Sequence, residues 1–321
     1  MPSVIYRWML WLVPGLLFAC QASNPAPSEP AMLPAQGPSL VVLGIAQDAG
    51  YPQVNCRKNC CRQVTEQGGE PVACLALIDP DQQRYWLFDA TPDFREQVAA
   101  VHQLFGSNGP PTLAGIFLTH AHIGHYTGLM QLGREVMGAR EVPVYAMPRM
   151  QDFLRHNGPW DQLVNLENIR LMPLHADSAI QLAPDIRVTP LPVPHRDEYS
   201  ETVGFRIQGA QRSALFIPDI DKWAQWERQV ANEVALVDVA FLDGTFFADD
   251  ELPGRNMAEI PHPFVAESMA HMASWPASER AKVHFIHFNH TNPLLQPDSE
   301  ASRTLEAAGL ARATTHQVVP L

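Results

Sequence analysis

Three histidines fall within six residues of this chain, at His120, His122 and His125, directly after the apolar residues 116–118. The apolar run predicts a buried strand that ends where the histidines begin. His120 and His122 are two positions apart, so extended backbone would project both in the same direction, and His125 lies where a following helix would start. Imidazole nitrogens are common ligands of zinc. The run therefore predicts a metal site at the end of a strand, and the fold must bring further ligands to that point.

The charge of the chain limits its partners. The sequence has 34 acidic and 22 basic residues and a formal net charge of −12. Lysine and arginine are not clustered, and binding to nucleic acid requires a basic patch. We therefore expect a small-molecule substrate and no nucleic-acid partner, and the sequence does not indicate the oligomeric state.

The N-terminus predicts export. Residues 1–19 have the layout of a signal peptide, with Arg7 before an apolar run that Pro14 and Gly15 interrupt. That run is too short and too broken for a membrane span. Residues 17–20 read Leu-Phe-Ala-Cys and resemble the bacterial lipobox, so we expect Cys20 to carry a lipid anchor and the protein to be periplasmic and attached to a membrane. A plain signal peptide and an uncleaved anchor are the alternatives.

Residues 20–38 are rich in proline and predict a tether, so one folded domain is expected over residues 39–321. Within it, short apolar runs predict strands at residues 40–46, 74–78, 85–88, 115–119, 142–146, 186–189, 204–207, 214–217, 237–242 and 283–287. Helical periodicity is found at residues 94–104, 127–137, 222–230, 263–272 and 300–308. This mixture predicts an α/β or α+β protein, and periodicity alone does not choose between a doubly wound sheet and two packed sheets.

The histidine run resembles the metallo-β-lactamase motif His-x-His-x-Asp-His, except that Gly124 stands where the motif has aspartate. Within that superfamily the chain is similar to the pyrroloquinoline-quinone biosynthesis protein B group. Four segments carry this closer resemblance, at residues 43–53, 89–93, 243–247 and 287–293. Members of the group tend to have lost the first two histidines and to keep the Asp-His pair, whereas this chain keeps His120 and His122 and lacks the aspartate. The resemblance implies an αββα sandwich, in which two mixed β-sheets pack face to face with helices on both outer faces.

The resemblance also implies the remaining ligands, which follow later strands in the expected order: His195, Asp219 and His287. A first metal would take His120, His122 and His195, with Asp219 beside it. A second would take His125, His287 and Asp219, and it would lack the motif carboxylate. We therefore expect one firmly held ion, with zinc favoured and iron an alternative, and a second ion weakly bound or absent.

The same resemblance implies a hydrolase. Zinc with three histidine ligands and an open position lowers the pKa of a bound water to about 7, and the resulting hydroxide would attack an ester, a phosphodiester or a similar bond. Because the motif aspartate is absent, His125, Asp219, His262 or His290 would have to orient the water, and His262 lies in a Pro-rich loop that would cap the pocket. An oxidative or carrier protein, as in pyrroloquinoline-quinone biosynthesis, and a metal-binding lipoprotein without turnover are the alternatives.

A second cluster consists of cysteines, at Cys56, Cys60, Cys61 and Cys74. Export favours one or two disulfides among them, and four cysteines allow three pairings. Relatives often hold a structural zinc ion here, so a zinc site is the alternative.

Overall fold

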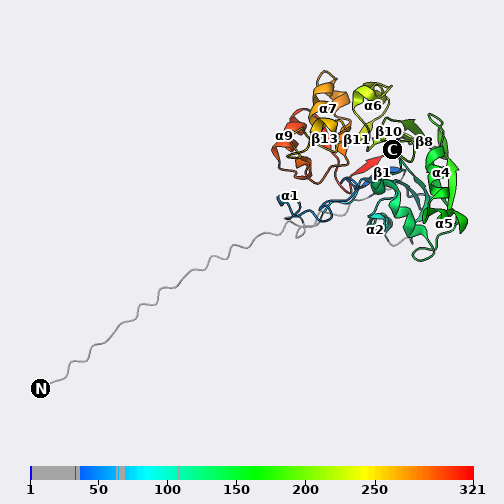
Figure 1. The fold of residues 1–321 in the computed structure, drawn as a ribbon. Helices are drawn as coiled ribbons and strands as arrows, with labels where there is room; N and C mark the ends of the chain where they lie inside the picture. Colours follow the sequence, from blue (N-terminus) through cyan, green and yellow to red (C-terminus); the bar gives the residue numbers. More distant parts are fainter. Residues whose placement is uncertain (2–32, 34–36, 63, 65–68, 107–108) are drawn as a thin grey trace. The chain divides into compact units, whose positions relative to one another are not determined.

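The computed structural model of the chain describes residues 1, 33, 37–62, 64, 69–106 and 109–321. The predicted signal segment, Cys20 and nearly all of the predicted tether therefore lie outside the described residues. Ala31–Leu321 forms one compact unit, which contains the two sheets and the helices around them (Figure 1). Among the described helices, none combines the length and the apolar character that crossing a membrane requires.

Two mixed sheets of seven strands each form the centre of this unit. The strands of the first sheet are, in spatial order, β14 (Val318–Pro320), β1 (Ser39–Gly44), β2 (Cys74–Asp79), β3 (Arg84–Phe88), β4 (Thr112–Phe117), β5 (Val142–Ala146) and β6 (Ile169–Pro173). Those of the second are β13 (Ala311–Arg312), β12 (Val283–Ile286), β11 (Val239–Asp243), β10 (Ser213–Ile217), β9 (Val203–Gln208), β8 (Ile186–Pro192) and β7 (Ile180–Ala183).

The strands nearest the histidine run are parallel. β3, β4, β5 and β6 run parallel in the first sheet, and β10, β11, β12 and β13 run parallel in the second. β1, β2 and β3 pair antiparallel, as do β7, β8, β9 and β10. Parallel neighbours end at the same edge of a sheet, so residues that follow these strands are brought together.

Alternation along the strands of the first sheet explains why two layers form. In β1, Leu40 and Val42 belong to the core between the sheets, whereas Val41 and Leu43 belong to the core beneath the helices. Both sets are buried, so this sheet is covered on both faces. The two sheets meet through aromatic rings: the Phe88 ring centroid lies 5.4 Å from that of Phe205.

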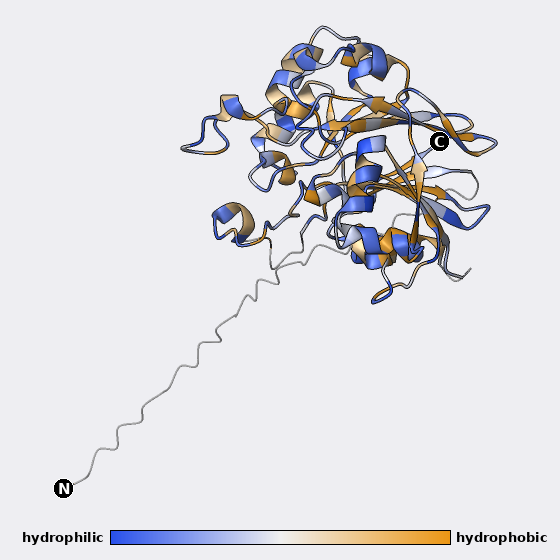
Figure 2. Cartoon of the chain, turned by 45° about the vertical axis from the view of Figure 1, so that its right-hand side comes forward, coloured by the Kyte–Doolittle hydropathy of each residue, from blue (hydrophilic) through white to orange (hydrophobic). Residues whose placement is uncertain are grey.

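Amphipathic helices cover the outer faces, and Figure 2 shows hydrophilic and hydrophobic residues side by side along them. α2 (Phe94–Phe105) buries Phe94, Gln97, Val101 and Phe105, whose spacing of three and four residues places them on one helical face. The remaining helices are α1 (Asn59–Arg62), α3 (Ile123–Tyr126), α4 (Pro148–His156), α5 (Trp160–Asn165), α6 (Val230–Ala235), α7 (Val265–Met272), α8 (Ala277–Arg280) and α9 (Glu300–Ala307). The αββα sandwich expected from the sequence is confirmed.

Some local predictions were wrong. The helix expected at residues 222–230 is a short 3-10 turn, Trp223–Gln225, and the α-helix begins only at Val230. The helix expected at residues 127–137 is a 3-10 helix over Thr127–Leu132. No predicted range covers the strands β6, β7, β13 and β14 or the helices α1, α4, α5 and α8. β7 is short and only half-buried, and its hydrophobic pattern is correspondingly weak.

Candidate metal centre

The ends of the parallel strands place the candidate ligands at one edge of the sandwich. β3 ends opposite β4, with Phe88 paired to Phe117, so Asp89 lies beside the start of the histidine run. In the second sheet Ile217 pairs with Leu242, and Asp243 pairs with Ile286. Residues that follow β10, β11 and β12 therefore converge there, including Asp219 and His287.

The first group contains every ligand that the sequence assigned to the first metal. Its ligand atoms all lie within 4.8 Å of one another, and its members are His120, His122, His195 and Asp219. His120 Nε2 lies 3.4 Å from Asp219 Oδ2, and His195 Nε2 lies 3.3 Å from Asp219 Oδ1. Three ring nitrogens and one carboxylate thus surround one point.

The outer nitrogens of two of these rings contact carboxylates. His195 Nδ1 lies 3.0 Å from Asp221 Oδ1, and His122 Nε2 lies 3.0 Å from Glu198 Oε2. A carboxylate only accepts hydrogen bonds, so each outer nitrogen carries the proton of a neutral imidazole. Carboxylate partners of this kind fix the tautomer of metal-binding histidines.

A hydroxyl group fixes the tautomer of His120 in the same way, with the proton on the outer nitrogen. Thr119 Oγ1 donates to the buried Asp89 carboxylate, so it accepts from His120 Nδ1, which lies 3.0 Å away. In the neutral form of each ring, the inner nitrogen then has a lone pair and no proton. These atoms face each other, with His122 Nδ1 2.8 Å from His120 Nε2 and 3.3 Å from His195 Nε2. Facing lone pairs repel, and a shared metal cation removes that repulsion.

The pKa shifts agree with neutral ligands for two of the rings. Burial lowers the pKa of His120 well below the ordinary value and also lowers that of His122. Burial acts in the same direction on His195, but the Asp219 and Asp221 carboxylates outweigh it and raise the pKa of His195 to about 10. A cation at the convergence point would compete with that proton.

A second group consists of Asp48, His125 and His287, whose ligand atoms also lie within 4.8 Å of one another. His125 Nε2 is 3.6 Å from Asp48 Oδ1. Asp48 Oδ1, His125 Nε2 and His287 Nε2 are buried atoms without a hydrogen-bond partner among the described residues. Unsatisfied buried polar atoms are costly, so three that converge fit a cation.

The outer nitrogens of His125 and His287 also have hydrogen-bond partners. His125 Nδ1 lies 2.7 Å from Asp89 Oδ2. Thr245 Oγ1 donates to Asp243 Oδ1, so it accepts from His287 Nδ1 at 3.0 Å. The ring tautomers of His120, His125 and His287 therefore depend on two buried carboxylates, Asp89 and Asp243.

Two residues of these networks have left-handed backbone. Asp89 has a φ of 71° and His287 a φ of 69°, and each directly follows a strand. Non-glycine residues in this region are uncommon and are found preferentially at functional sites. The backbone conformation turns both side chains into the cluster.

Asp219 lies between the two groups. One oxygen, Oδ2, is 3.4 Å from His120 Nε2 in the first group and 3.8 Å from His125 Nε2 in the second. The carboxylate is 3% exposed, which excludes solvation as its main stabilisation. Burial favours a raised pKa for Asp219, but His195 and His262 outweigh it and hold the pKa well below the usual range. A carboxylate in this position could contact a cation in either group.

His262 is buried beside Asp219. Its Nδ1 lies 3.1 Å from Asp219 Oδ1 and 2.8 Å from Asp243 Oδ2. Burial lowers its pKa, but the two carboxylates outweigh burial and raise it. The loop residue that the sequence placed over the pocket therefore touches the shared carboxylate itself.

The cysteines form a separate cluster without disulfides. Cys56, Cys60, Cys61 and His290 place their ligand atoms within 4.8 Å of one another, and all three thiols are free. The expected disulfides are absent from the described structure, and this arrangement corresponds to the zinc alternative. Cys74 was grouped with the others, but it begins β2, and its thiol lies against Asp89 O and Leu75 O in the core beneath the helices.

His290 was expected to be a candidate for orienting water. Instead it joins the thiols, and its buried Nδ1 has no hydrogen-bond partner among the described residues. The sequence could have paired it with the cysteines only through the fold, because more than 200 residues separate it from them.

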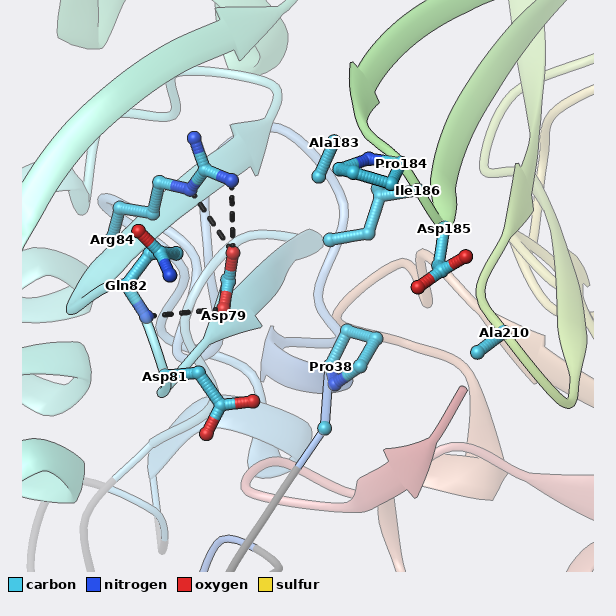
Figure 3. A pocket seen from close by; sticks show the side chains of 11 residues that line it. Pro38, Asp79, Asp81, Gln82, Arg84, Ala183, Pro184, Asp185, Ile186 and Ala210 are labelled. Carbon is cyan, nitrogen blue, oxygen red and sulfur yellow. Dashed lines mark hydrogen bonds and ion pairs between the residues drawn. The ribbon is translucent and has the colours of Figure 1, made fainter.

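A hollow elsewhere on the surface is separate from the metal-ligand groups. Figure 3 shows it between the turn after β2 and the β7–β8 hairpin, with Pro38 at its floor. Two of its four charged side chains pair with each other, because Arg84 Nη2 lies 3.0 Å from Asp79 Oδ2, and the other two are the carboxylates Asp81 and Asp185. None of the residues in the metal-ligand groups lines this hollow.

Comparison with known proteins identifies the class. The sequence model of the family described as "Beta-lactamase superfamily domain" matches residues 84–288, which is more than half of the chain. The chain therefore belongs to the β-lactamase superfamily, and its fold is the metallo-β-lactamase αββα sandwich.

Individual relatives show which members of the superfamily the chain is similar to. The chain is 28% identical over 300 residues to coenzyme PQQ synthesis protein B of Methylobacterium nodulans, covering 84% of this chain and 95% of the relative. The crystal structure of Zn²⁺-bound PqqB from Methylobacterium extorquens matches with a TM-score of 0.74 and 24% identity, over 88% of this chain and all of that one. A diphosphatase of the PhnP family matches with a TM-score of 0.61 and 22% identity, over 88% of this chain and 97% of that one.

The sequence analysis missed Asp48, which belongs to the second group, and the carboxylates that fix the rings. Asp48 lies in one of the segments that carried the resemblance, but nothing in its local pattern marks a ligand. Glu198 and Asp221 lie within three residues of His195 and Asp219, and this proximity was the available signal.

Proposed function

We propose that this protein is a metal-dependent hydrolase that cleaves ester or phosphodiester bonds. The observation that carries the proposal is the first group, where the inner ring nitrogens of three histidines and the Asp219 carboxylate face one point. A zinc ion bound there supplies Lewis-acid polarisation and lowers the pKa of a coordinated water to about 7.

The ligand side chains already have the orientation that binding an ion requires. The outer nitrogens of His195 and His122 are each anchored to a carboxylate 3.0 Å away, so both rings are oriented before substrate binds. The first group is also only partly enclosed. His122 is 16% exposed, whereas His120 and His195 are almost fully buried. Substrate therefore has access from the side of His122.

His262 is the residue best placed to move a proton. Asp219 and Asp243 hold the proton on its Nδ1 and raise the pKa of the ring, so the proton that His262 donates would be the one on Nε2. Protonating the leaving oxygen of an ester accelerates bond cleavage, and a positioned histidine commonly does this. We assign His262 this role and Asp219 the role of a ligand that also orients the reacting water.

Phosphodiesters are the first substrates to test. The fold likeness to a diphosphatase of the PhnP family supports this choice, although that likeness at 22% identity concerns the fold alone. The relation to coenzyme PQQ synthesis protein B supports a second candidate, an oxidative or carrier role in the chemistry of a quinone cofactor.

The test compares zinc-loaded wild type with His120→Ala on bis-p-nitrophenyl phosphate and on p-nitrophenyl acetate. We expect turnover of at least one substrate by the wild type and the rate of the buffer blank for His120→Ala. Absence of turnover of both by fully loaded wild type would contradict the hydrolase and favour the carrier role.

We also propose, from the signal-like residues 1–19 and the lipobox-like residues 17–20 alone, that the protein is exported and anchored through a lipid on Cys20. Expression in a bacterial host tests this. The wild type should sediment with membranes, and Cys20→Ser should not; equal sedimentation of both would contradict the anchor.

A further inference from the structure

We propose that Asp48 is the carboxylate ligand of a second metal ion, bound together with His125 and His287 and sharing Asp219 with the first. This inference rests on the proposed function for its first ion. It adds a ligand from a different loop, in place of the carboxylate that Gly124 does not provide.

The loop that carries Asp48 occupies the space beside Gly124. A Cβ atom built on Gly124 would lie 2.3 Å from Asp48 Oδ1 and 2.5 Å from Asp48 Cα. Any side chain at position 124 would therefore collide with the backbone of this loop as well as with its carboxylate. The glycine creates the space in which the Asp48 carboxylate approaches His125.

The atoms that face one another in this space have no other partners among the described residues. Asp48 Oδ1, His125 Nε2 and His287 Nε2 are all buried and unsatisfied, and the two rings are completely buried. Since Asp89 and Thr245 take the outer ring protons, both inner nitrogens offer lone pairs. His125 Nε2 and Asp48 Oδ1 are 3.6 Å apart, which is too far for a hydrogen bond, so hydrogen bonding within the group does not satisfy these atoms.

The Asp48 loop is fixed in register with His287. Ala46 forms a parallel bridge with Phe288, and Gln47 N donates to Phe288 O at 2.8 Å. Asn289 Nδ2 donates to Gln47 Oε1 at 2.6 Å. These bonds flank Asp48 on one side and His287 on the other, so the two ligands are held as one unit.

The loop also turns back directly after the ligand. Gly50 has a φ of 72°, a conformation that a side chain would strain, and its N–H donates to Gln47 O at 2.8 Å. The tight turn directs Asp48 toward His125 instead of toward solvent. Such preorganisation is typical of a ligand loop.

Asp219 joins the two sites. Its Oδ2 lies 3.8 Å from His125 Nε2, and the same carboxylate contacts His120 and His195 in the first group. With Asp48 the second site has two carboxylates and two imidazoles. The two carboxylates together balance the charge of a divalent ion. Two imidazoles and one shared carboxylate would not balance it.

The test is a count of bound Co²⁺ in wild type, Asp48→Asn and Asp48→Ala. Metal-free protein is titrated with Co²⁺ and freed of excess ion, and cobalt per chain is measured by mass spectrometry. Thiolate-to-cobalt charge-transfer absorption gives the ion held by the cysteine cluster, so the remainder belongs to the histidine region. Asp81→Asn, an exposed carboxylate outside every ligand group, is the matched control.

We expect two cobalt ions in the histidine region of wild type and Asp81→Asn, and one in both Asp48 variants. Asp48→Asn preserves the side-chain volume, and the ion that remains in the first group reports that the variant is folded. An unchanged count in the Asp48 variants, or a single ion in wild type, would overturn this inference and leave the hydrolase intact. No ion in the histidine region of wild type would overturn both.

Discussion

Asp48 and Gly124 share one space, because the Asp48 Cα atom lies 2.5 Å from the point where a Cβ atom on residue 124 would be. The glycine that separates the histidine run from the superfamily motif is thus accompanied by a carboxylate from another loop. Position 124 and position 48 should therefore depend on each other in any variant.

Gly124→Ala tests this dependence. The added methyl group must push the Asp48 backbone away, and overpacking of this kind costs about 1–3 kcal/mol of unfolding free energy. We expect that loss in denaturant unfolding, together with weaker binding of the second ion. The neighbouring Ile123→Ala, at a side chain 63% exposed, should stay within about 0.5 kcal/mol of wild type. Equal stability of the two variants would show that the Asp48 loop does not restrict position 124.

Asp221→Ala should weaken the first ion without removing it. Asp221 Oδ1 accepts from His195 Nδ1 at 3.0 Å, and loss of such an outer partner typically costs about 10–100-fold in metal affinity. Competition with a zinc chelator measures the change. Glu227→Gln, an exposed carboxylate nearby in the sequence, should leave the affinity unaltered. Matching affinities in the two variants would mean that the His195 ring does not require its carboxylate.

His262→Asn tests the assigned proton donor. We expect the first ion to be retained and kcat to fall by about 100-fold or more, as for removal of a general acid. The loss should be larger for a phenyl phosphodiester than for its p-nitrophenyl analogue, because p-nitrophenolate leaves without protonation. An equal loss on both substrates would indicate that His262 positions Asp219 and donates no proton.

The cysteines allow a comparison between Cys60, a half-buried member of the thiol cluster, and Cys74, which is buried in the core. Cys60→Ala should remove one zinc ion per chain, whereas Cys74→Ala should keep the full count, because Cys74 lies in the core beneath the helices. Zinc analysis of both variants checks this. Retention of all the zinc by Cys60→Ala would mean that the thiol and His290 cluster does not bind the metal.

The resemblance to the metallo-β-lactamase motif predicted the sandwich and the order of the ligands, because short segments of the sequence carry that resemblance. His195, Asp219 and His287 each follow an apolar run, and parallel strands bring such positions to one edge. The role of Asp48 and the placement of His290 beside the thiols could not be predicted in this way, because both depend on which loops the fold brings together. Asp48 is more than 70 residues from His125, so no local spacing relates them.

The helix misplaced at residues 222–230 has a similar cause. Its residues have helical periodicity, but Trp226 Nε1 donates to Pro192 O and Trp223 Nε1 donates to Ser268 Oγ. Both tryptophans thus bond to other parts of the fold, and the segment forms only a 3-10 turn before α6 begins. Tertiary contacts overrode a weak local preference here.

The central claim, that the first histidine group is a metal site, is tested most directly by metal analysis of protein purified without added metal. Mass spectrometry gives the metal content of wild type and of His120→Ala. The loss of metal in Cys60→Ala measures the ion bound by the thiolates, and subtracting it leaves the metal content of the histidine region. We expect at least one transition-metal ion there in wild type and a lower count in His120→Ala, with both proteins folded by circular dichroism. Folded wild type that holds no ion in this region, even after titration with Zn²⁺, would contradict it.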